Sequence, residues 1–263
     1  MGQRLGQHFL KNPVIARVLA QVCAIKEGEN VLEIGPGTGA LTRELLATSG
    51  NVIAIEKDEA LTTQLQHDFS DEIQEGRLRI VGADVREVAP ETLGLEAGKY
   101  VLAANIPYYI TGEILRQFLS ASTQPRVAAL LIQKEVAQRI IAKKESILSL
   151  SVKVYGKPRI ERYVSAGNFS PAPDVDSAIL VVEDISRANF DDTSHEAAFF
   201  KLVKAGFSSK RKMLVNNLSA FRKENVLSAF SSLGISEKAR AEDVPLSNWL
   251  SLSKLLSGQA SVS

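Results

Sequence analysis

The sequence is nearly free of cysteine, because Cys23 is the only one among its 263 residues. A disulfide within the chain is therefore impossible, and cysteine-rich zinc or iron–sulfur sites are excluded. Cys23 lies four residues after Leu19 and eight after Ile15, a spacing that places it on the apolar side of a predicted helix. We interpret Cys23 as a buried structural thiol and predict no bound metal.

Long apolar runs are also missing. The longest ones, such as residues 127–132, are far shorter than the roughly 20 residues that a membrane-spanning helix needs. Residues 1–8 lack the apolar stretch of a signal peptide. The sequence therefore predicts a cytoplasmic protein without a membrane partner.

A strong net charge is the third absence, since the formal charge is only +1. The basic residues are nevertheless segregated. Residues 1–26 carry four of them and residues 199–223 carry seven, and neither segment contains an acid. Such segments fit a phosphate-binding face or an ordinary solvated basic face, so charge alone leaves nucleic-acid binding open.

Short apolar runs alternate with helical patterns over the first two thirds of the chain. The predicted strands are residues 30–34, 52–55, 78–81, 100–104 and 127–132, and helices are expected to start near Ala40, Asp58, Thr111 and Lys134. An earlier helix is predicted to open at Asn12-Pro13, a cap followed by proline. This alternation predicts an α/β fold with a parallel sheet covered on both faces. Residues 159–165 and 177–182 are expected to close the sheet with an antiparallel member.

The pattern becomes helical throughout after about residue 188. Helices are predicted at residues 197–207, 210–218, 225–233 and 246–256. We therefore place one domain at residues 1–187 and a small helical domain at residues 188–263.

A glycine loop follows the first strand of the alternating region. The strand leads into Gly35-Pro36-Gly37-Thr38-Gly39, and a helix follows. Glycines let the backbone approach a ligand closely, and the free amides at the helix start face that ligand. Gly35-x-Gly37-x-x-Ala40 also fits the loose dinucleotide fingerprint, so the loop alone does not select a cofactor.

Acidic residues at three successive strand ends favour one cofactor. Glu33 precedes the loop, where its carboxylate would repel a pyrophosphate but attract the sulfonium and ammonium groups of S-adenosylmethionine. Glu56 and Asp84 end the next two strands and can accept hydrogen bonds from ribose and from the adenine amino group. Helix capping would explain one such acid, but it explains three poorly. The predicted cofactor is S-adenosylmethionine, and the predicted binding residues here are Glu33, Gly35, Gly37, Glu56, Asp84 and Val85.

The fourth strand ends in Asn105-Ile106-Pro107-Tyr108. The exocyclic nitrogen of adenine is a poor nucleophile, because its lone pair is delocalised into the ring. The Asn105 amide oxygen and the Ile106 backbone carbonyl can accept its two N–H groups and free the lone pair for attack. Pro107 fixes this backbone, and Tyr108 offers a face on which a flipped-out base can stack. The motif predicts adenine methylation, although a plain turn could also use the Asn and Pro.

These motifs resemble those of the KsgA-type family of small-subunit rRNA adenine dimethyltransferases, and the resemblance covers almost the whole chain. The matching segments are residues 5–10, 33–42, 55–56, 84, 105–111, 133–139, 169–177 and 207–218. Together these motifs are highly specific, although each alone would not be. Two stretches depart from the family pattern, because residues 143–147 replace a loop that usually contains Pro-Gly and residues 208–211 carry less arginine.

The resemblance implies a Rossmann-like methyltransferase sheet, mostly parallel with one antiparallel strand, and a small C-terminal all-α domain. Residues 1–187 would be the catalytic domain, and residues 188–263 would contact RNA. His8 and Leu10 would line the cofactor site, with Asn105 between the cofactor and the target base. Phe169 would stack on the target adenine opposite Tyr108.

The resemblance also implies a substrate. The family transfers two methyl groups to each of two adjacent adenosines near the decoding region of the small ribosomal subunit. The expected partner is therefore ribosomal RNA in an immature small subunit, and we expect a monomeric enzyme.

Other functions remain as alternatives. The related Erm methyltransferases modify large-subunit rRNA by the same chemistry, and residues 5–10 and 210–218 favour the small-subunit reading. A non-catalytic assembly factor on the same fold and, more distantly, an NAD-dependent oxidoreductase also remain. Pyrimidine C5 methylation needs a cysteine nucleophile, which the position of Cys23 on the early helix excludes.

Overall fold

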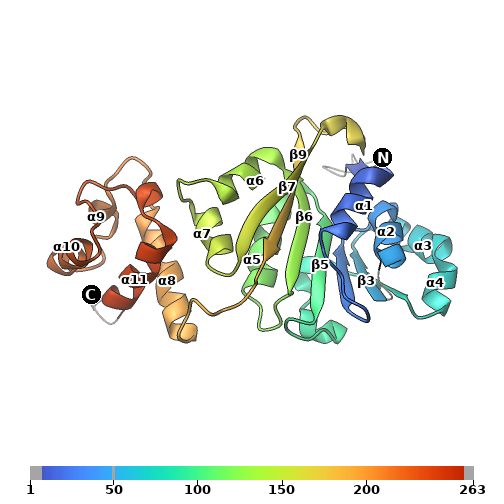
Figure 1. Cartoon of the computed structure of the whole chain (residues 1–263), viewed down its shortest axis with the longest axis horizontal. Helices are drawn as coiled ribbons and strands as arrows, with labels where there is room; N and C mark the ends of the chain where they lie inside the picture. Colours follow the sequence, from blue (N-terminus) through green and yellow to red (C-terminus); the bar gives the residue numbers. More distant parts are fainter. Residues whose placement is uncertain (1–7, 49–50, 258–263) are drawn as a thin grey trace. The chain divides into compact units, whose positions relative to one another are not determined.

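The computed structural model describes residues 8–48 and 51–257, which fold as two compact units (Figure 1). Residues up to 138 together with 156–185 form the first unit, and residues 139–155 together with 186 onward form the second. The chain passes from the first unit to the second for the last time between residues 185 and 186, close to the boundary predicted at residue 187. Residues 139–155, which the sequence analysis assigned to the first domain, are grouped instead with the C-terminal helices.

The first unit contains a seven-stranded sheet in the order β4-β3-β2-β5-β6-β9-β7, counted over the described residues. Its strands are β2 (Asn30–Ile34), β3 (Asn51–Glu56), β4 (Leu78–Gly82), β5 (Tyr100–Asn105), β6 (Val127–Gln133), β7 (Lys157–Val164) and β9 (Ser177–Glu183). Strand β9 runs antiparallel to both β6 and β7, and the remaining pairs are parallel. The prediction of a mostly parallel sheet with one antiparallel strand is confirmed.

The strand register brings the carboxyl ends together at one edge of this sheet. Ile34 pairs with Ile55 and with Ala104, and Glu56 pairs with Gly82. Asn105 at the end of β5 pairs with Leu131 of β6. The residues that follow these strands therefore lie side by side, at the edge where ligands bind in open α/β sheets.

Helices α1 (Pro13–Gln21) and α2 (Ala40–Thr48) pack on one face of the sheet (Figure 1). Leu19 of α1 and Leu45 of α2 belong to one buried cluster with strand side chains. The cluster members that come from the seven-stranded sheet are Val31, Val52, Ala54, Leu78, Val101, Ala103, Val127, Ala129, Leu131, Val164, Ile179 and Val181. The alternate residues Leu32 and Ile34 point to the opposite face and are also buried, so both faces are covered.

The start of α1 follows the prediction. Asn12 accepts a hydrogen bond from the Val14 amide at 2.9 Å, and Pro13 occupies the first helical position. Cys23 lies just past the helix and is fully buried, and its thiol donates to the Leu19 carbonyl. Burial raises the pKa of Cys23 to about 12, as expected for a structural thiol and not for a nucleophile.

Short elements complete the first unit. They are β1 (Phe9–Leu10), α3 (Glu59–Asp68), α4 (Ser70–Gln74), η1 (Val85–Glu87), η2 (Pro90–Leu93), η3 (Tyr108–Ile110), α5 (Thr111–Leu119), η4 (Ala166–Asn168) and β8 (Phe169–Ser170). Helix α6 (Lys134–Ile141) is shared by the two units: it begins in the first unit, and its residues from 139 onward belong to the second. Strands β1 and β8 pair antiparallel, with Phe9 opposite Ser170 and Leu10 opposite Phe169.

The second unit consists of helices. They are α7 (Ile147–Lys153), α8 (Thr193–Gly206), α9 (Leu214–Asn217), α10 (Lys223–Ser232), η5 (Ala241–Asp243) and α11 (Leu246–Leu256). The helix predicted at residues 210–218 is reduced to α9. The buried Asn217 side chain donates to the carbonyls of Gly206 and Ser209, which holds the segment between α8 and α9 as a loop.

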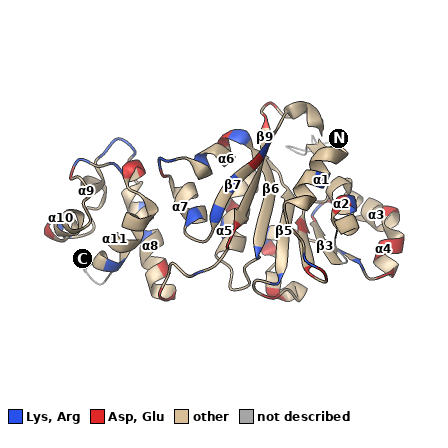
Figure 2. Ribbon diagram, in the orientation of Figure 1, with Lys and Arg blue, Asp and Glu red and all other residues tan. Residues whose placement is uncertain are grey.

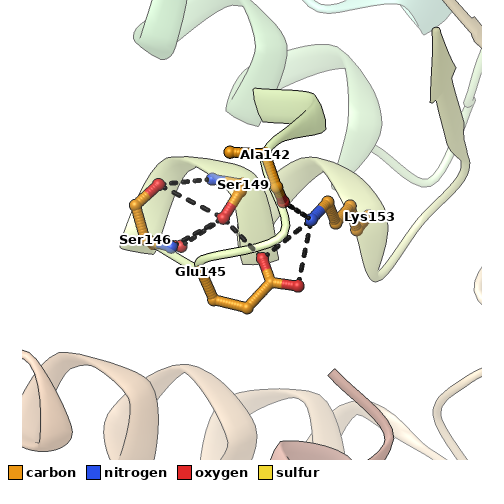
Figure 3. Close-up of polar contacts among 5 residues, drawn as sticks. All are labelled: Ala142, Glu145, Ser146, Ser149 and Lys153. Carbon is orange, nitrogen blue, oxygen red and sulfur yellow. Dashed lines mark hydrogen bonds and ion pairs between the residues drawn. The ribbon is translucent and has the colours of Figure 1, made fainter. Parts of the chain in front are cut away.

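The segment before α7 is one of the two stretches that depart from the family pattern, and its side chains form a polar network (Figure 3). The Lys153 ammonium donates to the Ala142 carbonyl at 2.8 Å and to both Glu145 carboxylate oxygens at 3.0 Å. Ser149 donates to the same carboxylate, and Ser146 caps α7. Glu145 is buried, so the Lys153 charge compensates a carboxylate removed from water.

Across the described residues, no helix combines the length and the apolar character required to span a membrane. Residues 1–7 lie outside the described part of the chain. Residues 5–7 of the opening motif and the segment on which the signal-peptide expectation rests therefore lie outside the described residues.

Candidate active site

A cavity lies at the carboxyl edge of the sheet, where β2, β3, β4 and β5 end. Most of the predicted site residues line it, although they come from six separate segments of the chain. The lining includes His8, Leu10, Gly35, Gly37, Glu56, Asp84, Val85, Asn105, Ile106, Pro107, Tyr108 and Phe169. The fold therefore gathers the predicted cofactor residues and the predicted target-base residues around one space.

The glycine loop connects β2 to α2 along this cavity. Gly37 has a positive φ of 58°, and a Cβ built there would lie 2.9 Å from Cδ1 of Phe9. A side chain at this position would therefore be strained and would push β1 away from the loop. At Gly35 a Cβ would lie 3.5 Å from the Asn105 carbonyl oxygen, which shows how closely the ends of β2 and β5 approach.

Glu56 is a buried carboxylate at the end of β3, and the backbone orients both of its oxygens. Oε2 accepts the Gly37 amide at 3.2 Å, and Oε1 accepts the Asp58 amide at 2.9 Å. An oriented carboxylate keeps further acceptor capacity toward the cavity, which suits a pair of ribose hydroxyls.

Asp84 lies past the end of β4 between two cations. Arg86 donates to both of its oxygens at 2.9 and 2.6 Å, and Lys57 donates to Oδ2 at 2.8 Å. These hydrogen bonds, from Arg86 first and Lys57 second, hold the pKa of Asp84 far below its usual range. Asp84 is therefore a permanently ionised acceptor at the cavity wall.

Glu33 is the predicted site residue that the structure does not bring to the cavity. Neighbouring strand residues point to opposite faces, and Ile34 is the one that lines the cavity. Glu33 points into the core, where neither of its oxygens nor the Thr42 hydroxyl has a hydrogen-bond partner among the described residues.

Complete burial raises the pKa of Glu33 to about 8, with Thr42 opposing the shift and the nearby Glu56 charge adding to it. Thr42 lies near enough to act electrostatically without reaching hydrogen-bond geometry. Burial therefore favours the uncharged form of Glu33, and its predicted role beside a cationic cofactor stays a prediction.

Asn105 ends β5 and contacts the N-terminal strand. Its Nδ2 donates to the His8 carbonyl at 3.3 Å, and its Oδ1 has no protein donor among the described residues. His8 in turn donates from Nδ1 to the Pro171 carbonyl at 2.8 Å, because a carbonyl can only accept. These contacts join the opening motif, β5 and the segment after β8 around the cavity.

The Asn-Ile-Pro-Tyr motif passes directly from β5 into the 3₁₀ turn η3. Pro107 has φ −56°, and its carbonyl accepts the Ile110 amide, which closes this turn. The Tyr108 ring stacks on the His8 ring with centroids 5.9 Å apart, and its hydroxyl pairs with the buried Ser177 hydroxyl at 2.8 Å. The motif therefore presents a fixed backbone and a fixed aromatic ring to the cavity.

Phe169 reaches the cavity from a part of the chain far from the other motifs. It lies in β8 opposite Leu10 of β1, is only 2% exposed and belongs to the main core cluster. The structure thus places Phe169 both in the core and in the lining, as a core residue with one side toward the cavity.

The sequence did not predict several of the lining residues. Three of these have charged or polar side chains, namely Lys57, Arg86 and Tyr109. The two cations adjoin predicted acids in the sequence, since Lys57 follows Glu56 and Arg86 lies two residues after Asp84. Acid–base neighbours at a strand end were the signal that could have revealed them.

The polar groups suit a zwitterionic nucleoside such as S-adenosylmethionine better than a dinucleotide. The Gly37 amide, which could face a pyrophosphate, donates to Glu56 instead. Glu56 is a buried carboxylate that accepts hydrogen bonds and would repel a phosphate. Within the described part of the chain, no three His, Cys, Asp or Glu side chains form a group that could hold a metal ion.

The second unit carries the basic segment of the sequence. All seven of its cations are exposed: Lys201, Lys204, Lys210, Arg211, Lys212, Arg222 and Lys223. Figure 2 shows Lys and Arg along the connection between α8 and α9. This loop is the one that the Asn217 side chain holds in place.

Comparisons with known proteins find matches over almost the whole chain. Residues 2–257 match the family described as Ribosomal RNA adenine dimethylase. The chain is 40% identical over 258 residues to Ribosomal RNA small subunit methyltransferase A of Deinococcus radiodurans, covering 92% of this chain and 81% of that protein. It is 34% identical over 263 residues to the protein of the same name from Fusobacterium nucleatum, covering 98% of each.

Two solved structures are similar over nearly the whole chain. A dimethyladenosine transferase from Plasmodium falciparum has a TM-score of 0.81 at 26% identity, covering 96% of this chain and 98% of that one. The 23S rRNA methyltransferase ErmE has a TM-score of 0.76 at 25% identity, covering 95% and 99%. The chain therefore belongs to the ribosomal RNA adenine dimethylase family, whose members use S-adenosylmethionine as methyl donor.

Proposed function

We propose that this protein transfers methyl groups to N6 of two adjacent adenosines in small-subunit ribosomal RNA during subunit assembly. The observation that carries the proposal is the Asn-Ile-Pro-Tyr motif, which leaves β5 beside the glycine loop and lines the same cavity. The curated relatives named for small-subunit methylation support the choice of substrate. We propose a monomeric enzyme that acts in the cytoplasm, where this substrate is assembled.

The cofactor half of the cavity is proposed to lie at β2, β3 and β4. Glu56 would hold the ribose hydroxyls, and Asp84 with Val85 would contact the adenine ring. His8, Leu10, Gly35 and Gly37 would enclose the methionine end. When bound there, S-adenosylmethionine supplies a methyl group on a positively charged sulfur, which needs no metal or general base to leave.

The target adenine is proposed to lie beside Asn105. The Asn105 Oδ1 and the Ile106 carbonyl would accept the two N–H groups of the base and leave its lone pair free for attack. Tyr108 and Phe169 would hold the ring from its two faces. Pro107 keeps the Ile106 carbonyl aimed, because its ring fixes the local backbone.

The helical unit is proposed to contact RNA through its exposed cations. Lysine and arginine side chains on a fixed loop suit phosphates, and their contribution falls as salt rises. Residues 208–212 are the most concentrated part of this surface.

The test is methyl transfer to purified ribosomal subunits that lack the modification. The protein is incubated with radiolabelled S-adenosylmethionine and, separately, with small and large subunits. Label in small-subunit RNA supports the proposal, whereas label in large-subunit RNA alone identifies an Erm-type activity. If the protein binds the cofactor but labels neither mature subunit, the assay is repeated with small subunits taken during assembly. If these also stay unlabelled, the protein is a non-catalytic assembly factor.

A further inference from the structure

The proposed cofactor site leaves one half of the carboxyl edge of the sheet unused, the half formed by β6, β9 and β7. The acids proposed to bind the cofactor follow β3 and β4, and the target-base motif follows β5. In a direct methyl transfer, the donor and the attacking nitrogen lie on opposite sides of the methyl group. In the strand order, β6, β9 and β7 lie on the side of β5 away from the proposed donor site, so a nucleotide next to the target base has room along these strand ends.

A chain of contacts leads along that edge. Tyr108 pairs with Ser177 at the start of β9, and Ser177 lies in register between Gln133 of β6 and Val164 of β7. Next to Val164 is Tyr163, which pairs with Ala178. Tyr163 is therefore one strand beyond Ser177 and belongs to the same carboxyl edge as the cavity.

Tyr163 is exposed but held in place. Its side chain is 53% exposed on the edge strand of the sheet. The Lys134 ammonium lies 5.5 Å from the centre of its ring, and Gln138 donates to its hydroxyl at 3.5 Å. A lone exposed tyrosine on a surface is ordinary, but this ring is oriented by two side chains of α6. Such an oriented ring offers a flat face at little entropic cost.

The Lys134 ammonium is only loosely paired with a carboxylate. The nearest carboxylate is Asp176, with 3.9 Å between Nζ and Oδ2, and Asp176 already accepts the Ala166 amide. The neighbouring acid Glu161 is paired with Arg159. Both signs of charge occur on these elements (Figure 2): α6 also carries Glu135 and Arg139, and β7 carries three cations beside Glu161. A cation beside an exposed aromatic ring is the combination that binds single-stranded nucleic acid, with the base on the ring and the phosphate on the cation.

We propose that Tyr163 and Lys134 form a platform for a single-stranded RNA nucleotide that flanks the target adenosine. The identification of the ligand as the substrate strand rests on the proposed function. The platform itself is a stacking site, so it accepts any base and adds affinity without adding sequence readout.

The first experiment measures the Kd of a fluorescently labelled single-stranded oligoadenylate by anisotropy, without any catalysis. Tyr163→Ala is expected to weaken binding about tenfold, because a stacked base is lost. Tyr163→Phe keeps the ring and is expected to stay within about twofold of wild type. Lys134→Gln is expected to lower the slope of log K against log salt by about 0.7, the value for one phosphate on a single strand, and Lys134→Arg to restore it.

The second experiment repeats the methylation assay on whichever ribosomal subunit accepts label. Tyr163→Ala is expected to raise KM for the subunit about tenfold while kcat stays within about twofold, because the platform binds and does not react. Calorimetric binding of S-adenosylmethionine at wild-type affinity shows that the variant is folded.

The platform is refuted if folded Tyr163→Ala binds oligoadenylate as wild type does, or if the wild type does not bind it measurably. The proposed function fails on a different result, namely the absence of methyl transfer by the wild type to small subunits. The two failures are therefore distinguishable.

Discussion

At the residue scale, Asn105 uses only part of its side chain within the protein. Its Nδ2 donates to the His8 carbonyl, while Oδ1 remains an acceptor beside the cavity. We expect Asn105→Ala to lower kcat about 10²- to 10³-fold, the usual cost of removing one positioned group that stabilises a transition state. The rate is measured on saturating small subunits. Calorimetry on the same variant should show a cofactor Kd within a few-fold of wild type, and full activity would remove Asn105 from the site.

Glu33 gives a second expectation, about stability and pH. Its pKa is about 8 in the folded protein, against 4.5 for an ordinary Glu. Between these values the folded state keeps its proton and the unfolded state loses it, so this group makes folding less favourable as pH rises from about 4.5 to 8. Glu33→Gln has the same shape without the titration.

We therefore expect the stability of Glu33→Gln relative to wild type to increase by a few kcal/mol from pH 5 to pH 8. Urea unfolding of both proteins at several pH values, without cofactor, measures this difference. A difference that is constant with pH would show that Glu33 is ionised in the core.

The same residues show what sequence could and could not predict at this scale. Glu56, Asp84 and Asn105 were predictable, because each ends a strand and the ends of parallel strands meet. The position of Glu33 outside the lining was also predictable, since neighbouring residues of a strand such as Glu33 and Ile34 point to opposite faces. That Phe169 lies at the cavity could be inferred only from family resemblance. Its position depends on the pairing of β8 with β1, two strands that are far apart in the sequence.

At the element scale, the glycine loop depends on the close approach of β1. We expect Gly37→Ala to weaken cofactor binding at least about tenfold, because its Cβ would both strain the backbone and displace Phe9. Gly28→Ala is the matched control, since Gly28 also has a positive φ but no atom lies within 4 Å of its Cβ position. It should cost about 1 kcal/mol of stability and leave the cofactor Kd unchanged. Equal effects on Kd would refute the role of Phe9.

The polar network before α7 gives a prediction for a second element. Lys153→Met would leave the buried Glu145 carboxylate without its cation, and we expect a loss of about 3 kcal/mol in the free energy of unfolding. Lys157→Met breaks the exposed pair with Asp184 and should leave stability near wild type. Denaturant unfolding of the two variants checks this contrast, which equal losses would contradict.

Strands and most helices were predictable because their periodicity is local. The helix expected at residues 210–218 was not formed as predicted, because the Asn217 side chain satisfies two carbonyls that a continuous helix would have used differently. The grouping of residues 139–155 with the C-terminal helices was also beyond sequence patterns. It involves contacts such as Lys144 with Glu242, 98 residues apart, which no local pattern encodes.

At the scale of the whole molecule, the fold does not choose the substrate. The dimethyladenosine transferase and the 23S rRNA methyltransferase ErmE both match nearly the whole chain, with TM-scores of 0.81 and 0.76. The choice of the small subunit rests instead on sequence, through relatives that are 34–40% identical over more than 90% of the chain. Because the net charge is only +1, the affinity for RNA is expected to come from local basic surfaces and not from the charge of the whole molecule.

The most direct test of the account is to identify the methylated nucleoside and its position. Small subunits lacking the modification are reacted with wild type and with Asn105→Ala, and their RNA is digested and analysed by mass spectrometry. We expect N6,N6-dimethyladenosine at two adjacent positions with the wild type and almost none with the variant. Methylation of another base, or of large-subunit RNA alone, would contradict it.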